Sequence, residues 1–187
     1  MKKLVFVFAV LLSFSFAAQA QEGIKLGLKA GVNYSSLSGD GTDELDSQFG
    51  FHVGGFLDYG ISEMVSIRPE LLFSTKGFAV SGDGDNDFNQ TLSYIDLPIM
   101  VRVNAGGLYF EGGPTLGYLV SVKEGETDDY KKFEFGYAAG LGYQMPSGLG
   151  IGLRYQGGLT SIIDNDDADK ITNSVFQLGL SYTLGTK

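Results

Sequence analysis

The stretch KFEFGYAAGLGYQMPSGLGIGLRYQGGLT, residues 132–160, decides the fold of this chain. In its first half every second residue is large and apolar, and the residues between are small or singly polar. After a turn at residues 145–148 the same alternation resumes. A two-residue period is typical of a strand, and two strands of about 11 residues joined by a tight turn predict a β-hairpin.

The two faces of this hairpin differ in size as well as polarity. One face carries Phe133, Phe135, Tyr137, Leu141 and Tyr143, followed by Leu149, Ile151, Leu153, Tyr155 and Leu159. The other face is mostly glycine, interrupted by single side chains such as Glu134 and Arg154. In a soluble sheet, a glycine-rich face in water would only weaken the strands. In a transmembrane barrel the large face meets lipid and the small face fits a narrow polar lumen, so this arrangement is favoured.

The same alternation occurs along the rest of the chain. It predicts eight strands at about residues 23–34, 49–59, 65–76, 91–103, 108–120, 133–144, 149–160 and 174–184. Short links follow the second, fourth and sixth strands, whereas polar links at 35–48, 77–90, 121–131 and 161–173 follow the others. The interior of an eight-stranded barrel is too narrow to hold all the large apolar side chains. We therefore predict an all-β fold, an eight-stranded antiparallel up-and-down transmembrane β-barrel.

Residues 1–20 form a separate segment. A basic start, the apolar run Leu4–Phe16 and the small residues Ala18 and Ala20 predict a cleaved signal peptide rather than a membrane helix. The barrel domain then comprises residues 21–187, and the formal charge of −9 becomes −11 without Lys2 and Lys3. Such acidity argues against nucleic acid as a partner. The absence of cysteine excludes disulfides and thiol chemistry.

Four segments resemble one known family. The runs SIRPELLFSTKG (66–77), SYIDLPIMVRV (93–103), YFEGGPTLGYLVS (109–121) and the opening hairpin are similar to PorT-like, porin-family outer-membrane β-barrel proteins of Gram-negative bacteria. The resemblance implies an outer-membrane location, contact with lipid and lipopolysaccharide, insertion by the outer-membrane assembly machinery, and a monomer. Such barrels usually end on an aromatic residue, whereas here Tyr182 or Leu184 would take that role.

Charged residues on the small faces predict a structural charge network in the lumen. Its members are Arg68, Glu70, Asp96, Arg102, Glu111, Glu134 and Arg154, and Lys25, Lys29, Asp58, Lys76 and Lys132 share the same face. Buried charges are costly unless they are paired, so we expect ion pairs that plug the bore. A narrow solute or ion path is the alternative. Paired carboxylates alone do not indicate acid–base catalysis, and we predict no enzyme activity.

Other candidate sites are weaker. His52, the only histidine, lies among glycines on a lumen face, which favours a hydrogen-bonded structural role over a catalytic triad or a metal site. The long links are acidic, and Asp83 begins a run like a calcium loop that has Phe88 and Tyr94 where glycine and glutamate are required. We expect solvated loops, with weak binding of divalent cations as the alternative, and no cofactor.

Two further features carry structural predictions. Pro69, Pro98 and Pro114 lie inside predicted strands and are expected at bulges or strand ends, because proline cannot donate to a sheet ladder. Eight aromatic residues near strand ends are expected to form girdles at the membrane interfaces. These are Phe49, Tyr59, Tyr109, Phe110, Phe133, Tyr143, Tyr155 and Tyr182.

These patterns together predict an integral outer-membrane barrel with a plugged polar lumen and acidic surface loops, in a structural or surface-interaction role. Two alternatives stay open. One is a barrel that serves transport or secretion. The other is a soluble periplasmic, lipocalin-like barrel in which the apolar side chains would line a ligand cavity.

Overall fold

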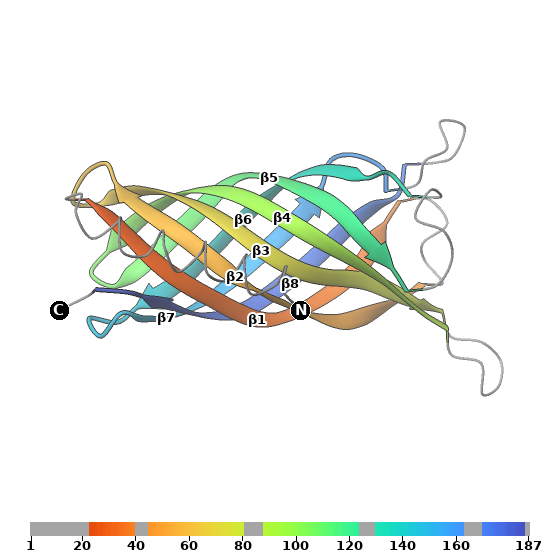
Figure 1. Ribbon diagram of the computed structural model, residues 1–187, viewed down its shortest axis with the longest axis horizontal. Coiled ribbons are helices and arrows are strands. Elements are labelled where there is room, and N and C mark those ends of the chain that lie inside the picture. The colour runs from red at the N-terminus through yellow and green to blue at the C-terminus, as the bar shows by residue number, and fades with distance from the viewer. Residues whose placement is uncertain (1–22, 40–44, 81–87, 124–129, 163–169, 186–187) are drawn as a thin grey trace, which may run out of the picture.

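Eight antiparallel strands close on themselves (Figure 1). The computed structural model describes residues 23–39, 45–80, 88–123, 130–162 and 170–185. The strands are β1 (Ile24–Ser38), β2 (Leu45–Gly60), β3 (Val65–Val80), β4 (Phe88–Ala105), β5 (Leu108–Val122), β6 (Phe133–Gln144), β7 (Leu149–Gly158) and β8 (Thr172–Thr183). Each strand pairs with its sequence neighbours, and β1 pairs with β8. The predicted fold class is confirmed.

In the described part of the chain, no helix is long and apolar enough to span a membrane.

The links alternate in length as predicted, and the three short ones lie together at one end of the barrel (Figure 1). Between β4 and β5 only Gly106 and Gly107 remain outside the strands, with φ values of 60° and 96°. Positive φ at both central residues is what a two-residue hairpin turn requires, and glycine adopts it without steric cost.

Several strands run further than the sequence predicted, toward the other end of the barrel. β3 continues to Val80, where it pairs with both Leu45 of β2 and Phe88 of β4. The alternation of apolar and polar residues fades there, although the ladder of backbone pairs continues. The alternation of apolar and polar residues reflects the contrast between lipid and lumen. Strand pairing that extends beyond the membrane therefore leaves no such alternation in the sequence.

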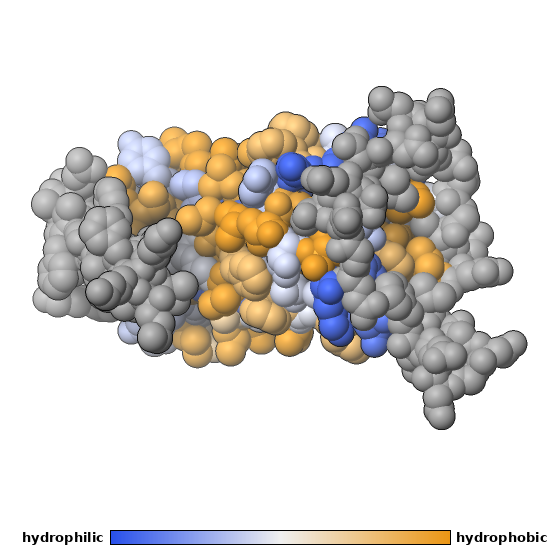
Figure 2. Space-filling view, turned by 45° about the vertical axis from the view of Figure 1, so that its right-hand side comes forward, coloured by the Kyte–Doolittle hydropathy of each residue, from blue (hydrophilic) through white to orange (hydrophobic). Residues whose placement is uncertain are grey.

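The large apolar side chains turn away from the barrel axis. Phe135, Leu153 and Leu178 are 50–55% exposed, whereas Arg68 and Glu111 are 2% and 8% exposed. Figure 2 shows the result as a hydrophobic belt around the visible face of the barrel. This orientation confirms the expected assignment of faces. It argues against the soluble, lipocalin-like alternative, in which these side chains would line the interior.

The prolines do not lie where the sequence predicted. Pro69, Pro98 and Pro114 are inside β3, β4 and β5, and the pairing keeps one register on both sides of each. Register shifts occur elsewhere, between Ser47 and His52 and between Ser93 and Tyr94. The prediction of bulges or strand ends was therefore wrong.

Each proline instead interrupts the ladder with the preceding strand for two residue pairs. The β2–β3 pairing skips Pro69 and its neighbour, the β3–β4 pairing skips Pro98, and the β4–β5 pairing skips Pro114. Because proline has no N–H, the ladder loses a bond on that side and resumes unchanged beyond it. The intact ladder with the following strand holds the register.

Aromatic side chains form a continuous outer stripe across five neighbouring strands. Tyr34 contacts Phe49 with ring centroids 5.1 Å apart, and Phe176 contacts Tyr155 at 5.1 Å, which in turn contacts Tyr137 at 6.1 Å. Tyr34 and Phe176 are register partners, which joins the two groups. Amphipathic rings in such a stripe suit a membrane interface.

Tyr109 is the exception among the predicted girdle residues. It is only 5% exposed, because it belongs to the inward phase of β5.

Candidate functional site

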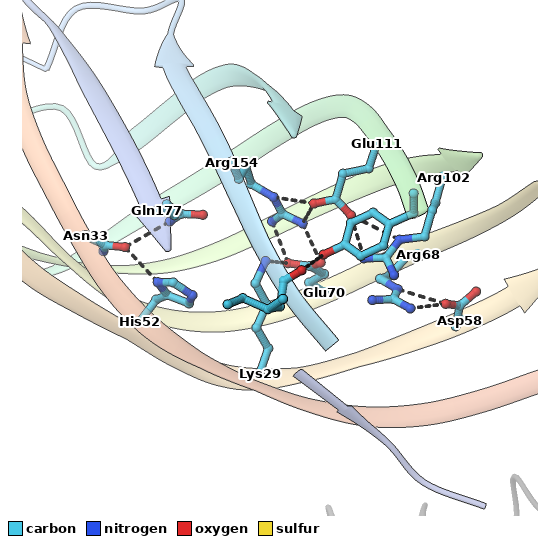
Figure 3. Close-up of polar contacts among 12 residues, drawn as sticks. Lys29, Asn33, His52, Asp58, Arg68, Glu70, Arg102, Glu111, Arg154 and Gln177 are labelled. Carbon is cyan, nitrogen blue, oxygen red and sulfur yellow. Dashed lines mark hydrogen bonds and ion pairs between the residues drawn. The ribbon is translucent and has the colours of Figure 1, made fainter. Parts of the chain in front are cut away.

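The centre of the lumen is crossed by ion pairs that converge on Arg154 of β7 (Figure 3). Its two terminal nitrogens donate to the two oxygens of Glu70 on β3, at 2.7 and 2.8 Å. Its Nε donates to Oε1 of Glu111 on β5 at 2.8 Å. Lys29 of β1 pairs with Glu70 at 3.2 Å, and Arg102 of β4 pairs with Glu111 at 2.7 Å. One network therefore joins five strands.

Arg68 completes this group through Asp58 of β2, to which its Nε donates at 2.9 Å. We name the seven charged residues the Arg154 layer, comprising Lys29, Asp58, Arg68, Glu70, Arg102, Glu111 and Arg154. Two inward aromatic rings pack on its guanidinium groups. The Arg68 carbon Cζ lies 4.0 Å from the centre of the Phe56 ring, and that of Arg102 lies 3.6 Å from the centre of Tyr109. These contacts fill space between the cations and the wall.

A second charged group surrounds Lys76 of β3. Its ammonium donates to Asp96 of β4 at 3.1 Å and to Glu134 of β6 at 3.4 Å, and it lies 4.6 Å from the ring centre of Tyr94. Asn173 of β8 donates to the same Glu134 carboxylate at 3.0 Å. We name Lys76, Asp96 and Glu134 the Lys76 layer. Lys76 has no exposed side-chain surface, so its charge depends entirely on these partners.

His52 is hydrogen bonded inside the barrel (Figure 3). Its Nδ1 lies 2.8 Å from Oδ1 of Asn33, which also accepts from Gln177 at 3.2 Å. The amide nitrogen of Asn33 donates to Ser74 and to two backbone carbonyls, so Oδ1 is left as the acceptor. Nδ1 of His52 therefore carries the proton. The ring is thus hydrogen bonded to another side chain, as the structural role predicted for it requires.

A buried apolar cluster lies toward the end of the barrel that carries the long links. It consists of Leu92, Tyr94, Leu119 and Ile162, all at most 3% exposed, with Leu37, Val122, Tyr130 and Ile171 packed against it. Ile162 follows β7 and is held by two backbone bonds, from its N–H to Ile171 and from the N–H of Lys131 to its carbonyl. This role of Ile162 was not predicted, because the residue lies in a segment expected to be a polar loop.

All seven residues of the predicted lumen charge network lie inside the barrel, but in two groups. Five belong to the Arg154 layer, and Asp96 and Glu134 belong to the Lys76 layer. Lys132 was wrongly assigned to the shared face, because it is exposed in a bend before β6. Lys25 keeps the phase of Lys29 as the register partner of Asp58, but it is exposed near the start of β1 rather than buried in the bore.

The sequence analysis did not recognise that Phe56 and Tyr109 stack on arginines inside the lumen. The signal was present in part, because a large ring on a glycine-rich face needs a small residue opposite it. Inward glycines on the next two strands make room for Tyr109: Gly142 on β6, its register partner, and Gly152 on β7. A Cβ added at Gly152 would lie 2.2 Å from the Tyr109 hydroxyl and 3.4 Å from Cζ. A Cβ at Gly142 would lie 2.3 Å from the hydroxyl and 2.4 Å from Cζ.

We expect Gly152→Ala to destabilise the barrel by about 1–3 kcal/mol through overpacking, and Tyr109→Phe to restore most of the loss. The restoration follows because only the hydroxyl of Tyr109 is too close to the added methyl group. Gly142→Ala is the matched control that Tyr109→Phe should not rescue, since the ring carbon and the Ile151 carbonyl also collide there. Urea unfolding in lipid vesicles of the three single variants and of the two double variants that combine Tyr109→Phe with an alanine substitution measures the coupling. Equal rescue of both alanine variants would contradict this packing.

The acidic links lie almost entirely outside the described residues, including the run that begins at Asp83. Of their carboxylates the structure describes Asp46, in β2. Within the described ranges, no group of three or more histidine, cysteine, aspartate or glutamate side chains could hold a metal ion.

Comparison with known proteins identifies the class of barrel. A family model described as outer membrane protein beta-barrel domain matches residues 17–164. The chain belongs to this family. No curated protein sequence matches it.

Solved structures with the same fold include other outer-membrane barrels. Neisserial surface protein A superposes with a TM-score of 0.58 at 14% identity, covering 86% of this chain and 99% of that one. Ail, the attachment invasion locus protein of Yersinia pestis, gives 0.51 at 16% identity, covering 88% and 100%. Ail in a phospholipid bilayer nanodisc gives 0.53 at 19% identity, covering 87% and 100%.

These identities establish a shared fold only. Family membership and fold together place the chain in the outer membrane, where its apolar belt contacts lipid. The narrower likeness to PorT-like members stays a prediction.

Proposed function

We propose that this protein is a closed outer-membrane barrel with a structural or surface-interaction role, not a pore or an enzyme. The observation that carries the proposal is the Arg154 layer, because its ion pairs cross the bore between facing walls. Arg154 reaches from β7 to Glu70 on β3 while also binding Glu111 on β5. An ion passing this level would have to separate buried pairs, which is costly.

The apolar cluster around Leu92 and Ile162 adds a second obstruction nearer the end with the long links. Hydrated ions would have to shed water to pass an apolar constriction of this kind. The two obstructions differ in chemistry, so a single change in salt or charge would not open both.

Conductance of the purified protein in planar bilayers tests the closed bore. We expect no current steps above the background of protein-free bilayers, with an open porin in the same bilayers as the positive control. Reproducible current steps would remove the closed-bore proposal. They would favour the alternative of a barrel that serves transport or secretion, which solute uptake by a deletion strain would then examine.

The surface role proposed here involves the outer-leaflet lipopolysaccharide. Outside the lumen, the lysines of the described residues are Lys25 at the start of β1 and a group at the opposite end. That group comprises Lys123, Lys131, Lys132 and Lys170. They follow β5 or precede β6 and β8, at the rim that faces the cell exterior in barrels of this layout. Lysines at this level suit lipid phosphates.

A triple variant of Lys123, Lys132 and Lys170 to glutamine tests this contact. We expect it to lose the thermal stabilisation that diphosphorylated lipid A gives to the wild-type protein in vesicles. Lys25→Gln, at the opposite end, should retain it. Equal stabilisation of the triple variant by phosphate-bearing and phosphate-free lipid A, at the wild-type level, would reject a role for these lysines.

Export and assembly are also part of the proposal. We propose that residues 1–20 are a signal peptide, so that the mature protein begins at Gln21, and that the assembly machinery inserts a monomeric barrel. Intact mass of protein extracted from outer membranes tests the cleavage site. Depletion of the assembly machinery should lower the folded fraction, and cross-linking in native membranes should give no homodimer.

A further inference from the structure

The Arg154 layer contains more positive than negative charge. Its cations are Lys29, Arg68, Arg102 and Arg154, and its carboxylates are Asp58, Glu70 and Glu111. All are buried or nearly so, and every carboxylate already has at least one cationic partner. Four cations against three carboxylates leave one positive charge in excess. Such an excess in a water-poor interior is unfavourable without a counter-charge.

The Lys76 layer has the opposite excess but does not supply that counter-charge directly. Its two carboxylates, Asp96 and Glu134, contact Lys76, and Glu134 is also bound by Asn173. Among the described residues, the ion pairs of Asp96 and Glu134 are with Lys76 alone.

A cavity lies where the excess positive charge is concentrated. It has a volume of about 10 Å³, which is room for roughly one water-sized species. All four cations of the Arg154 layer line it, with Glu111 as the only carboxylate in its wall. Gly152 of β7 and Gly179 of β8 also line it.

A hydroxyl group in the same wall has no protein partner. Ser181 lines the cavity, is 8% exposed, and its buried Oγ makes no hydrogen bond. It is the register partner of Lys29, so the hydroxyl and the ammonium belong to neighbouring positions on β8 and β1. A hydroxyl that donates beside an ammonium group is a suitable pair of ligands for an anion.

We propose that this cavity binds a small monovalent anion of the size and charge of chloride. The anion would neutralise the excess charge and accept hydrogen bonds from the Ser181 hydroxyl and the Lys29 ammonium. A water molecule could satisfy Ser181 and the unbonded amide oxygen of Gln177, but it would leave the charge of the layer uncompensated. The accessible 12% of the Lys29 side chain marks the side from which the anion enters.

Urea unfolding of the full mature chain in lipid vesicles tests the site. Chloride is varied against gluconate at constant ionic strength, so that general screening stays the same. Binding to the folded state alone makes the folding equilibrium constant rise in proportion to chloride above its dissociation constant. We therefore expect about a tenfold rise in that constant for each tenfold rise in chloride in the saturating range.

Lys29→Met is the decisive variant, because it leaves three cations with three carboxylates while Glu70 keeps its two bonds from Arg154. We expect its folding constant not to respond to chloride. Lys25→Met is the matched control, since Lys25 lies four positions earlier on the same face of β1 but outside the cavity, and its response should be that of the wild type.

Ser181→Ala provides a second variant if Lys29→Met does not fold, and it should weaken the response. Crystals grown in bromide offer a direct readout, with an anomalous peak between Lys29 and Ser181 expected. The proposal fails if the wild-type protein responds equally to chloride and gluconate, or if Lys29→Met keeps the wild-type response. Failure here would leave the closed-bore proposal untouched, because bilayer conductance tests that separately.

Discussion

Replacing Arg154 by methionine is expected to destabilise the barrel by about 3–5 kcal/mol, the usual cost of breaking a buried ion pair by removing one partner. The substitution would leave Glu70 with Lys29 alone and Glu111 with Arg102 alone. Four hydrogen bonds from the guanidinium group to buried oxygens would also be lost. Methionine fills much of the same volume, so the loss of stability measures the contribution of the charge rather than of packing. Urea unfolding in lipid vesicles measures it.

Arg154→Lys separates charge from geometry. Lysine keeps the positive charge but cannot place planar donors on Glu70 and Glu111 together, so an intermediate loss is expected. Lys25→Met, at the exposed start of β1, is the control for loss of a lysine charge and should change stability by less than about 1 kcal/mol. If Arg154→Met lowered the free energy of unfolding by no more than this control, the Arg154 layer would contribute nothing to stability.

Arginine in place of Leu153 is expected to cost about 2–4 kcal/mol, the range for a charged side chain on the lipid face near the middle of the membrane. Leu153 is 50% exposed, lies centrally in β7 and pairs with two other outward leucines, Leu141 and Leu178. In water an exposed arginine at the same position would cost little. The size of the effect therefore reports the solvent that surrounds the barrel.

The control is Leu149→Arg on the same strand and face. Leu149 begins β7, directly after the short link at residues 145–148, and should lie near the membrane interface. There the cost falls to about 0–1 kcal/mol, because the side chain reaches water. Refolding into vesicles and measuring the free energy of unfolding compares the two. Equal costs at both positions would contradict a membrane that spans the centre of β7.

The assignment of faces could be read from single strands. In β6 the alternation of Phe133, Glu134, Phe135 and Gly136 already separates lipid-facing from lumen-facing residues, and the structure keeps that separation. Strand ends at the short links were also predictable, because Gly106, Gly107 and Gly148 mark them and have positive φ. Most of the strand ends toward the long links lie beyond the predicted ones, because the alternation stops before the pairing does. β7, in contrast, ends at Gly158 rather than at the predicted residue 160.

The sequence predicted which residues line the lumen, but not which of them contact one another. Inward phase was enough to select Arg68, Glu70, Arg102 and Arg154 as lumen residues. It could not show that Arg68 binds Asp58 while Arg154 binds Glu70, nor that Asp96 belongs to a different group around Lys76. The prolines illustrate the same limit, since a general rule for sheets predicted bulges that the neighbouring intact ladders make unnecessary.

A one-dimensional pattern was therefore sufficient for the number of strands, their direction and the face each presents to lipid, because these depend on neighbours two positions apart. Which charges meet inside the barrel depends on strand stagger and closure, which bring together residues as distant as Glu70 and Arg154, 84 positions apart. The same closure gathers four cations around one small cavity. The Tyr109 ring, in contrast, meets Gly142 and Gly152 through the pairing of consecutive strands, β5 with β6 and β6 with β7. Contacts between facing walls arise only when the first strand pairs with the last.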